Sequence, residues 1–362
     1  MKEDLFIELI KKNLPESAHF IGDDTAYVHK KDLILTQDTL IEDVHFRKST
    51  ISPYYLGRKA IAVNLSDIAA AGGEPSYALI SLSLPENIDE NFIEEFYKGV
   101  NDICSKYGVL VVGGDLTRAF QITISVCMLG FGNGLIPANR RNAKVGDYVI
   151  VTGNFGSSRA GLEILEKNRQ DVPEEIKEKF VKAHINPVPR IKEGRIILRA
   201  AKNPALMDAS DGLADALSKI CLFSNVAMHI NFDDIPYDKD LSLVAVDKIN
   251  IFKWVLFGGE DYELVGTVSE KVYKKLIDFG IFVKIIGTVV SADDAPYPYV
   301  KYKKKMIKID SEIMKKEIFG HFADCEQRLG NPLFRLSIEK EGGGGGDEPS
   351  TEMPFNASNQ DK

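Results

Sequence analysis

Acidic residues recur beside glycine or other small residues at six points along the sequence. The six segments are Gly22-Asp23-Asp24, Gln37-Asp38-Thr39, Asn64-Leu65-Ser66-Asp67, Gly113-Gly114-Asp115, Asp208-Ala209-Ser210-Asp211-Gly212 and Gly258-Gly259-Glu260-Asp261. Each reads as the end of a strand or the start of a turn. If the fold brings these carboxylates together, they repel one another unless cations lie between them. Oxygen ligands favour Mg²⁺, Mn²⁺ or Ca²⁺ over zinc or copper, and Mg²⁺ completes its shell with water and phosphate oxygens. The sequence therefore predicts a site that holds a polyphosphate through several metal ions.

The strongest of these segments also have simpler interpretations. Asp67 lies in the almost wholly apolar stretch 60–71, where burial of a lone carboxylate is costly, so it is either a metal ligand or on a helix face exposed to water. Asp208 and Ser210 can point the same way along an extended chain, and Asp211 then opens a helix whose free N–H groups favour anions. A plain helix cap is the alternative for this segment. For Gly22-Asp23-Asp24, the alternative is a surface turn.

Glycines and basic residues add candidate phosphate contacts. Gly113-Gly114-Asp115 follows an apolar strand that we expect to be buried, and its glycines let the backbone approach a phosphate closely. Residues 153–158 (Gly-Asn-Phe-Gly-Ser-Ser) resemble a phosphate cradle at a helix N-terminus, although the Gly-Lys-Ser/Thr ending of a P-loop is missing. Arg140 and Arg141 either pair with phosphates or belong to a solvated basic linker.

Histidines and possible nucleophiles provide weaker indications of function than the acidic segments. His45 is the only histidine embedded in an acidic segment, and it is either a functional residue or a partly buried histidine with its hydrogen bonds satisfied. No Ser/His/Asp or Cys/His arrangement stands out, so we do not expect a protein nucleophile.

Composition and charge exclude several classes of protein. With 362 residues, 44% of them hydrophobic, the chain can form about two domains with substantial cores. The net charge of −8 argues against a nucleic-acid binder, because a phosphate backbone would be repelled. The four cysteines show no CxxC spacing, which is typical of reduced thiols. The charged N-terminus is no signal peptide, and no apolar run approaches the ~18 residues of a membrane span. We therefore expect a cytoplasmic protein that binds neither nucleic acid nor membrane.

Strand and helix signals alternate along the chain, which predicts an α/β fold. The main predicted strands cover 33–36, 77–84, 109–112, 122–129, 148–151, 205–207, 262–268 and 283–289, and the main predicted helices cover 53–71, 92–107, 174–184 and 188–201. A polar, basic connector near 132–144 separates two units, and five glycines at 342–346 lie in a polar C-terminal segment. We predict domains at 1–135 and 136–325, followed by a disordered tail at 326–362.

Taken together and in this order, the segments closely resemble thiamine-monophosphate kinases. The matching residues are Gly22-Asp23-Asp24, Asp38-Thr39-Leu40 with His45-Phe46, Asn64 to Asp67 with Ala69-Ala70, Gly113-Gly114-Asp115, Gly146-Asp147-Tyr148 with Val151-Thr152-Gly153, Pro187-Val188-Pro189-Arg190, Asp208 to Leu213 and Gly258 to Leu264. The resemblance spans about residues 20–322. The family shares a superfamily with aminoimidazole ribonucleotide synthetase, selenophosphate synthetase and a hydrogenase-maturation protein.

The resemblance implies an α/β (α+β) fold of two domains. The N-terminal mixed sheet would form a barrel-like interface across a homodimer, and the C-terminal domain would be an α/β sandwich. The implied activity is ATP-dependent phosphorylation of thiamine monophosphate to thiamine diphosphate, assisted by several Mg²⁺ ions.

The resemblance also assigns roles to residues of this chain. It places metal ligands at Asp24, Thr36, Asp38, Asp67, Asp115, Asp208 and Asp211, ATP contacts at Tyr97, Gly114, Asp115, Arg140 and Ser210, and substrate contacts at His45, Glu260 and Phe319. An aromatic face over a cationic thiazolium ring is physically favourable. Gln37 stands where the family usually has threonine, and Arg141-Asn142 replaces a usual Ser-Gly, so the nucleotide contact could fall on either arginine.

The acceptor in such a reaction is itself a phosphate. Its second pKa is ~6, so it is already anionic near neutral pH and needs no strong general base. Metal-bound aspartates would neutralise both polyanions and align a direct in-line transfer without a covalent phosphoenzyme. Two alternatives remain, namely another ATP-dependent synthetase of the same superfamily and a divalent-cation-binding protein without catalysis.

Overall fold

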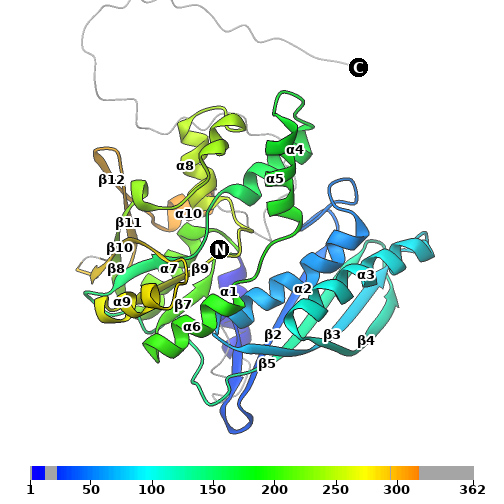
Figure 1. The fold of residues 1–362 in the computed structure, drawn as a ribbon, viewed down its shortest axis with the longest axis horizontal. Coiled ribbons are helices and arrows are strands. Elements are labelled where there is room, and N and C mark those ends of the chain that lie inside the picture. Colours follow the sequence, from blue (N-terminus) through cyan, green and yellow to red (C-terminus); the bar gives the residue numbers. More distant parts are fainter. Residues whose placement is uncertain (1, 13–22, 294, 318–362) are drawn as a thin grey trace, which may run out of the picture. The chain divides into compact units, whose positions relative to one another are not determined.

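The computed structural model describes residues 2–12, 23–293 and 295–317, and in these ranges the chain forms two β-sheets with helices packed on them (Figure 1). The first sheet has five strands in the order β1-β2-β5-β3-β4. The second has seven strands in the order β12-β11-β8-β10-β6-β9-β7. The predicted mixed α/β class is confirmed. Within the described part of a single chain, neither sheet closes into a barrel.

In the described part of the chain, helices cover only one face of the first sheet. Its strands are β1 (Ala26–Val28), β2 (Leu33–Ile41), β3 (Glu74–Leu84), β4 (Leu110–Arg118) and β5 (Thr123–Phe131). Burial alternates residue by residue along β5, as expected for a sheet with one apolar face. Helices α2 (Pro53–Ala70) and α3 (Glu90–Tyr107) pack on this apolar face (Figure 1). Ser52 caps α2 by accepting a hydrogen bond from the N–H of Tyr55, which confirms the predicted helix start.

The strand predicted at 109–112 is present as the start of β4, but the prediction that it is buried is wrong. Val109 is buried, but it precedes β4, and all nine residues of this edge strand are exposed. Leu110, Val112 and Leu116 expose 62%, 57% and 70% of their surface. An apolar run in the sequence indicates a surface that avoids water, but it cannot say whether the same chain or another molecule covers that surface.

The second sheet is covered on both faces. Its strands are β6 (Tyr148–Val151), β7 (Ala205–Asp208), β8 (Val226–Asn231), β9 (Leu264–Val268), β10 (Lys284–Ser291), β11 (Pro298–Tyr302) and β12 (Lys305–Lys308). Val149 and Val151 of β6 point into one core and Ile150 into another, which explains the continuous apolar run there. The first of these cores includes α4 (Ser157–Lys167), α5 (Glu174–Ile185), α7 (Leu213–Ser224) and α8 (Lys248–Phe257), and the second includes α6 (Ile191–Ala201) and α9 (Glu270–Asp278).

Helix α2 also contacts the helices of the second sheet. Ala69 and Ala70 of α2 belong to the same core as α6. A Cβ atom on Gly194 of α6 would lie 2.0 Å from the carbonyl oxygen of Ala69, so only glycine permits this approach. The contact explains why α2 is apolar on nearly all sides, and it brings the end of α2 to the end of β7.

The remaining elements are short or terminal. They are α1 (Lys2–Lys12), α10 (Ser311–Glu317) and the 3₁₀ helices His29–Lys31, Phe232–Asp234 and Lys239–Leu243. Among the described helices, none has both the length and the apolar character of a membrane span. The predicted tail at 326–362 lies outside the described residues.

Candidate active site

Four of the predicted metal ligands lie near one another where β2, α2 and β7 meet. Asp24 precedes β1, Asp38 is on β2, Asp67 is on α2 and Asp208 ends β7. Asp67 is within electrostatic reach of the other three carboxylates. We call these four residues the aspartate cluster. The sequence separates its members by up to 184 positions, and the fold removes that separation as predicted.

Hydroxyl and amide groups hold the aspartate cluster in place. The hydroxyl of Thr36 donates to Oδ2 of Asp67 at 2.5 Å, and the hydroxyl of Ser66 donates to Oδ2 of Asp208 at 2.5 Å. The backbone N–H of Asp38 donates to Oδ1 of Asn64 at 3.1 Å. Because Asn64, Ser66 and Asp67 come from the last turns of α2, one helix orients three of the four aspartates.

Two cations flank the aspartate cluster. Arg140 lies 3.1 Å from Oδ1 of Asp23 and pairs with Oδ1 of Asp24. Its side chain is buried, so the interpretation of Arg140 as part of a solvated linker is wrong, whereas Arg141 is exposed. On the other flank, Nζ of Lys219 lies 3.4 Å from Asp211 and 2.6 Å from Asp215.

The charges of the aspartate cluster are incompletely balanced. Burial raises the pKa of Asp24 to about 7, with Asp208 adding to the rise and Arg140 opposing it. Burial also raises the pKa of Asp208 to about 6 despite the hydrogen bond from Ser66. The pKa of Asp67 is raised well above its ordinary value by burial and then by the neighbouring aspartates. Carboxylates in this state favour the arrival of further positive charge.

The donor set fits a hard divalent cation. All four members offer carboxylate oxygens, and phosphate or water can complete an octahedral shell around Mg²⁺. Among the described residues, no group of three or more carboxylates, histidines or cysteines is placed to hold a metal ion by itself. The hydroxyls of Thr36 and Ser66 each occupy one carboxylate oxygen. A cation bound at the cluster would therefore need further oxygen ligands from phosphate or water.

A second acidic group lies at Glu260. Its Oε1 is 2.7 Å from Nζ of Lys59, and its Oε2 is 3.4 Å from Nδ1 of His184. Burial raises the pKa of Glu260, but Lys59, His184 and His45 together outweigh burial and lower it. The structure thus brings the two predicted substrate residues, His45 and Glu260, within electrostatic reach of each other. His45 is also anchored, because its Nδ1 accepts the N–H of Ile41 at 3.0 Å.

The segment 258–263, which we call the acidic loop, links the two groups. Glu260 and Tyr262 have φ angles of 56° and 52°, in the left-handed region that side chains other than glycine rarely adopt. The N–H of Glu260 donates to the carbonyl of Ser210 at 2.6 Å. Tyr262 is buried, and burial raises its pKa, with further contributions from Glu260, Asp38 and two other aspartates. The left-handed residues also explain why β9 begins at Leu264 rather than at the predicted residue 262.

The predicted phosphate cradle at 153–158 is wrong. Asp261 accepts the N–H of Gly156 at 2.7 Å and the N–H of Ser158 at 3.0 Å. The N-terminus of α4 is therefore already occupied by a carboxylate of the same chain. The sequence pattern found the helix start correctly, but it could not show that a residue about 100 positions later fills it.

Comparison with known proteins places the chain in a family. Residues 22–132 match the model of the AIR synthase related protein N-terminal domain, and residues 144–296 match the model of the C-terminal domain. The thiamine-monophosphate kinase of Aquifex aeolicus is 39% identical over 276 residues, which cover 75% of this chain and 87% of that protein. The Bacillus subtilis thiamine-monophosphate kinase is 37% identical, covering 87% of this chain and 98% of that protein. The chain belongs to the thiamine-monophosphate kinase family.

A solved structure of the family also matches the fold. The structure described as "AaThiL complexed with AMPPCP and TMP" superposes with a TM-score of 0.73 at 35% identity, covering 84% of this chain and 95% of that chain.

The residues that the kinase resemblance assigns are not all together in one chain. Asp115 is in register with Ser81 and, through β5, with Ser125 and Thr39. These four side chains lie on the uncovered face of the first sheet, opposite to Asp38. β4 is also three strands away from β2, or about 14 Å at the usual strand spacing.

The other assigned residues divide in the same way. Gly114 is on β4 beside Asp115, and Tyr97 lies half-exposed on α3, which contacts that edge of the sheet. Arg140 and Ser210 instead lie with the aspartate cluster and the acidic loop. Phe319 lies outside the described residues.

Sequence reasoning missed the two residues that hold the carboxylate of Glu260, Lys59 and His184. Lys59 is buried in α2, and His184 is buried on α5. The sequence did carry a signal for Lys59, because it is a charge at the start of an apolar helix. His184 carried none, since its partner Glu260 lies 76 positions later.

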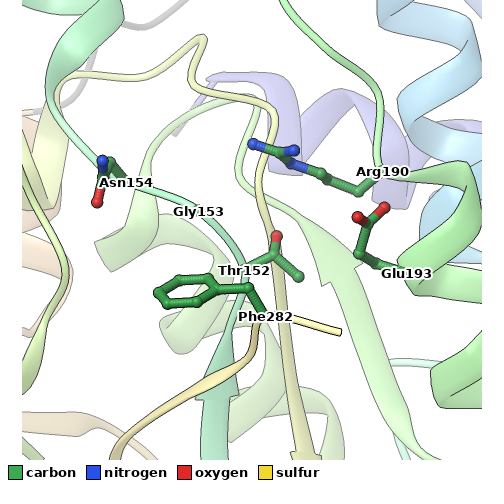
Figure 2. A pocket seen from close by; sticks show the side chains of 6 residues that line it. All are labelled: Thr152, Gly153, Asn154, Arg190, Glu193 and Phe282. Atoms are coloured by element: carbon green, nitrogen blue, oxygen red, sulfur yellow. The ribbon is translucent and has the colours of Figure 1, made fainter. Parts of the chain in front are cut away.

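A pocket of about 250 Å³ lies beside the acidic loop but contains none of the assigned kinase residues. Figure 2 shows Arg190 and Glu193 on one side of it and Asn154 with Phe282 on the other. Arg190 is held by Glu263 through two hydrogen bonds of 2.6 and 2.5 Å. The acidic loop thus carries two ion pairs, Glu260 with Lys59 and Glu263 with Arg190.

Proposed function

We propose that this chain transfers the γ-phosphoryl group of ATP to thiamine monophosphate and so forms thiamine diphosphate. The observation that carries the proposal is the convergence of the aspartate cluster beside Glu260 and His45 in a chain of this family. One group suits metal-bound phosphates, and the other suits the cationic and amino groups of a thiamine. The relative described as "AaThiL complexed with AMPPCP and TMP" supports the same pair of substrates, since AMPPCP is an ATP analogue.

We further propose that Asp24, Asp38, Asp67, Asp208 and Asp211, with Thr36, hold Mg²⁺ ions. When bound, Mg²⁺ supplies charge neutralisation for the two polyanionic reactants. The residues of the chain do the rest. Ser66 and Asn64 fix Asp208 and the backbone of Asp38, and Arg140, which pairs with Asp24, would contact the nucleotide. The acceptor phosphate is already anionic at neutral pH, so the transfer needs no protein base.

The transfer is direct, without a phosphorylated serine. One serine lies close to a histidine, since Oγ of Ser158 is 3.0 Å from Nδ1 of His184. Both side chains are buried behind Glu260, so this hydroxyl cannot reach a substrate. Positioning and charge stabilisation therefore supply the catalysis.

We propose that the enzyme is a homodimer and that each site takes β4 from the partner copy. The apolar, exposed edge strand β4 and the uncovered face of the first sheet support an interface there, and such an interface would place the two sheets in a barrel-like arrangement. Asp115, Gly114 and Tyr97 are separated from the aspartate cluster within one chain. A second copy would supply these residues and complete the nucleotide site.

We also propose domain limits of 1–135 and 136–325. The two family models, which end at residue 132 and begin at residue 144, support a boundary in this region.

Release of ADP tests the proposed reaction directly. The protein with ATP and Mg²⁺ should release ADP with thiamine monophosphate, but not with thiamine or without an acceptor. A superfamily synthetase that phosphorylates a carbonyl or amide oxygen would ignore thiamine monophosphate. A non-catalytic cation-binding protein would give no ADP and would be stabilised by Mg²⁺ alone as strongly as by ATP with Mg²⁺. Either outcome would refute the proposal.

A further inference from the structure

Lys59 is an ammonium group sealed inside the protein. Its side chain is 1% exposed, and it lies on α2, which packs on the apolar face of the first sheet. A buried ammonium is costly unless it is paired, and Nζ lies 2.7 Å from Oε1 of Glu260. The proposed reaction itself assigns no step to Lys59. Its position therefore calls for a reason connected with Glu260.

His184 holds the other oxygen of Glu260. Its Nδ1 lies 3.4 Å from Oε2 of Glu260 and 3.0 Å from Oγ of Ser158. Burial, and then the charge of Lys59, lower the pKa of His184 to about 3, so the ring is neutral near pH 7. The adjacent carboxylate favours the tautomer with its proton on Nδ1, because a lone pair facing the carboxylate would repel it. Glu260 is thus held by one cation from α2 and one neutral donor from α5.

The backbone of Glu260 is fixed as well. Its φ of 56° is left-handed, and its N–H donates to Ser210 at 2.6 Å. Yet 28% of the Glu260 side chain remains exposed, while Lys59 and His184 are buried behind it. The carboxylate therefore has a closed side that is held by the protein and an open side toward solvent. Such an arrangement is typical of a preorganised binding group.

We propose that Lys59 and His184 are positioning residues that keep the Glu260 carboxylate ionised and in one orientation for the acceptor. This inference rests on the proposed function, because it takes the acceptor to be thiamine monophosphate. Lys59 compensates the charge of Glu260 on the closed side. Binding of the acceptor therefore depends on the orientation of the carboxylate rather than on a long-range negative potential. Neither residue touches the acceptor, and both act through Glu260.

A double-mutant cycle on Lys59→Met and Glu260→Gln tests this inference, with KM for thiamine monophosphate as the readout. Lys59→Met alone should raise this KM about 10-fold or more, while KM for ATP stays within about twofold. In the Glu260→Gln background, Lys59→Met should add little, because the group through which it acts is already altered. Lys59→Arg should restore part of the loss, since it returns the charge. Lys179→Met, which removes another cation of the described chain from its pairs with Asp238 and Asp240, is the matched control and should leave both KM values unchanged.

The pH dependence supplies a readout that a purely structural role would not move. The charged and titratable groups facing Glu260 are Lys59 from α2, His184 from α5, His45 after β2, and Asp261 and Tyr262 from its own loop. Without Lys59, burial would dominate and raise the pKa of Glu260. In Lys59→Met, KM for thiamine monophosphate should therefore rise more steeply than the wild-type value as pH falls from 8 to 6. The ratio of the two KM values at each pH removes the titrations that both proteins share, including that of the acceptor phosphate.

Two failures of this experiment are distinguishable. If the wild-type protein shows no ADP release with thiamine monophosphate, the proposed function and this inference both fall. If the wild type is active but Lys59→Met raises KM by the same factor with and without Glu260→Gln, only this inference falls. Circular dichroism and thermal melting of all variants check folding, and the double variant keeps the test decisive because it leaves no buried charge unpaired.

Discussion

The aspartate cluster and the acidic loop both contain buried carboxylates, but their charges are balanced in opposite ways. In the acidic loop each carboxylate has a partner from another element. Lys59 pairs with Glu260 and Arg190 with Glu263, while Asp261 accepts two N–H groups at the start of α4, although burial still raises its pKa to about 7. In the aspartate cluster the carboxylates face one another, and the pKa of Asp67 is raised by burial and by three other aspartates.

The difference separates carboxylates whose charge the chain itself compensates from carboxylates whose charge a bound cation can compensate. A folded chain that holds a carboxylate in one orientation supplies matching donors, because an unpaired buried charge is costly. When the charges of several neighbouring carboxylates are incompletely compensated, their repulsion lowers the stability of the folded chain. A bound cation can restore that stability. The two regions are adjacent, so local composition alone does not tell them apart.

The largest expected effect is loss of turnover in the aspartate cluster. Asp208→Asn should lower kcat at saturating Mg²⁺ at least about 1,000-fold with the fold intact, because it removes a ligand charge that the transfer needs. Steady-state ADP release and circular dichroism measure both properties. Asp171→Asn, at an exposed aspartate paired with Arg169, is the control and should be unaffected. Near-normal turnover of Asp208→Asn would contradict the assignment of Asp208 as a metal ligand.

Mixing two inactive variants extends the same prediction to the proposed dimer. Asp115→Asn should be inactive as well, and an equal mixture of re-associated Asp115→Asn and Asp208→Asn should regain about a quarter of wild-type turnover. Half of the dimers would be mixed, and each would contain one intact site. A mixture that re-associates but stays inactive would contradict the sharing of sites between copies.

A smaller effect, on stability, is expected where a partner is removed from the acidic loop. Arg190→Met leaves Glu263 buried and without its cation, so the free energy of unfolding should fall by about 3 kcal/mol. Urea unfolding followed by fluorescence measures the change. Adding Glu263→Gln should recover part of the loss, since the uncompensated charge is then gone. A loss that persists unchanged in the double variant would mean that the ion pair is not its cause.

The smallest expected effect is a gain of stability in the aspartate cluster. Asp67→Asn removes one of several mutually repelling carboxylates, so the metal-free protein should become more stable by about 1 kcal/mol. The stabilisation by ATP with Mg²⁺ should shrink at the same time. Thermal melting with and without ATP and Mg²⁺ measures both changes. A metal-free Asp67→Asn protein that is less stable than the wild type would contradict the difference in charge balance between the aspartate cluster and the acidic loop.

Much of this arrangement could be predicted from the sequence, and the reasons for the exceptions are physical. Local signals sufficed for the start of α2 at Ser52 and for the acids near the ends of α2 and β7, Asp67 and Asp208. The expectation that Asp38 lies at a strand end or turn is wrong, because β2 continues to Ile41. Local signals did not suffice for β4, whose apolar residues look the same whether they are buried or exposed. They also did not show that Asp261 would cap α4 or that Lys59 would pair with Glu260, since both contacts depend on tertiary structure alone.

Helix α2 connects the two ends of the reaction. Lys59, near its start, supports the group that would receive the acceptor, and Ser66, seven residues later, supports the group that would receive the nucleotide phosphates. Seven residues correspond to about two turns and roughly 10 Å of rise. Because α2 is packed on nearly every side, its length cannot change. The helix therefore fixes the distance between the group that would receive the acceptor and the group that would receive the nucleotide phosphates. The enzyme should therefore select acceptors by length as well as by chemistry, because a phosphate on a shorter or longer arm would miss the donor.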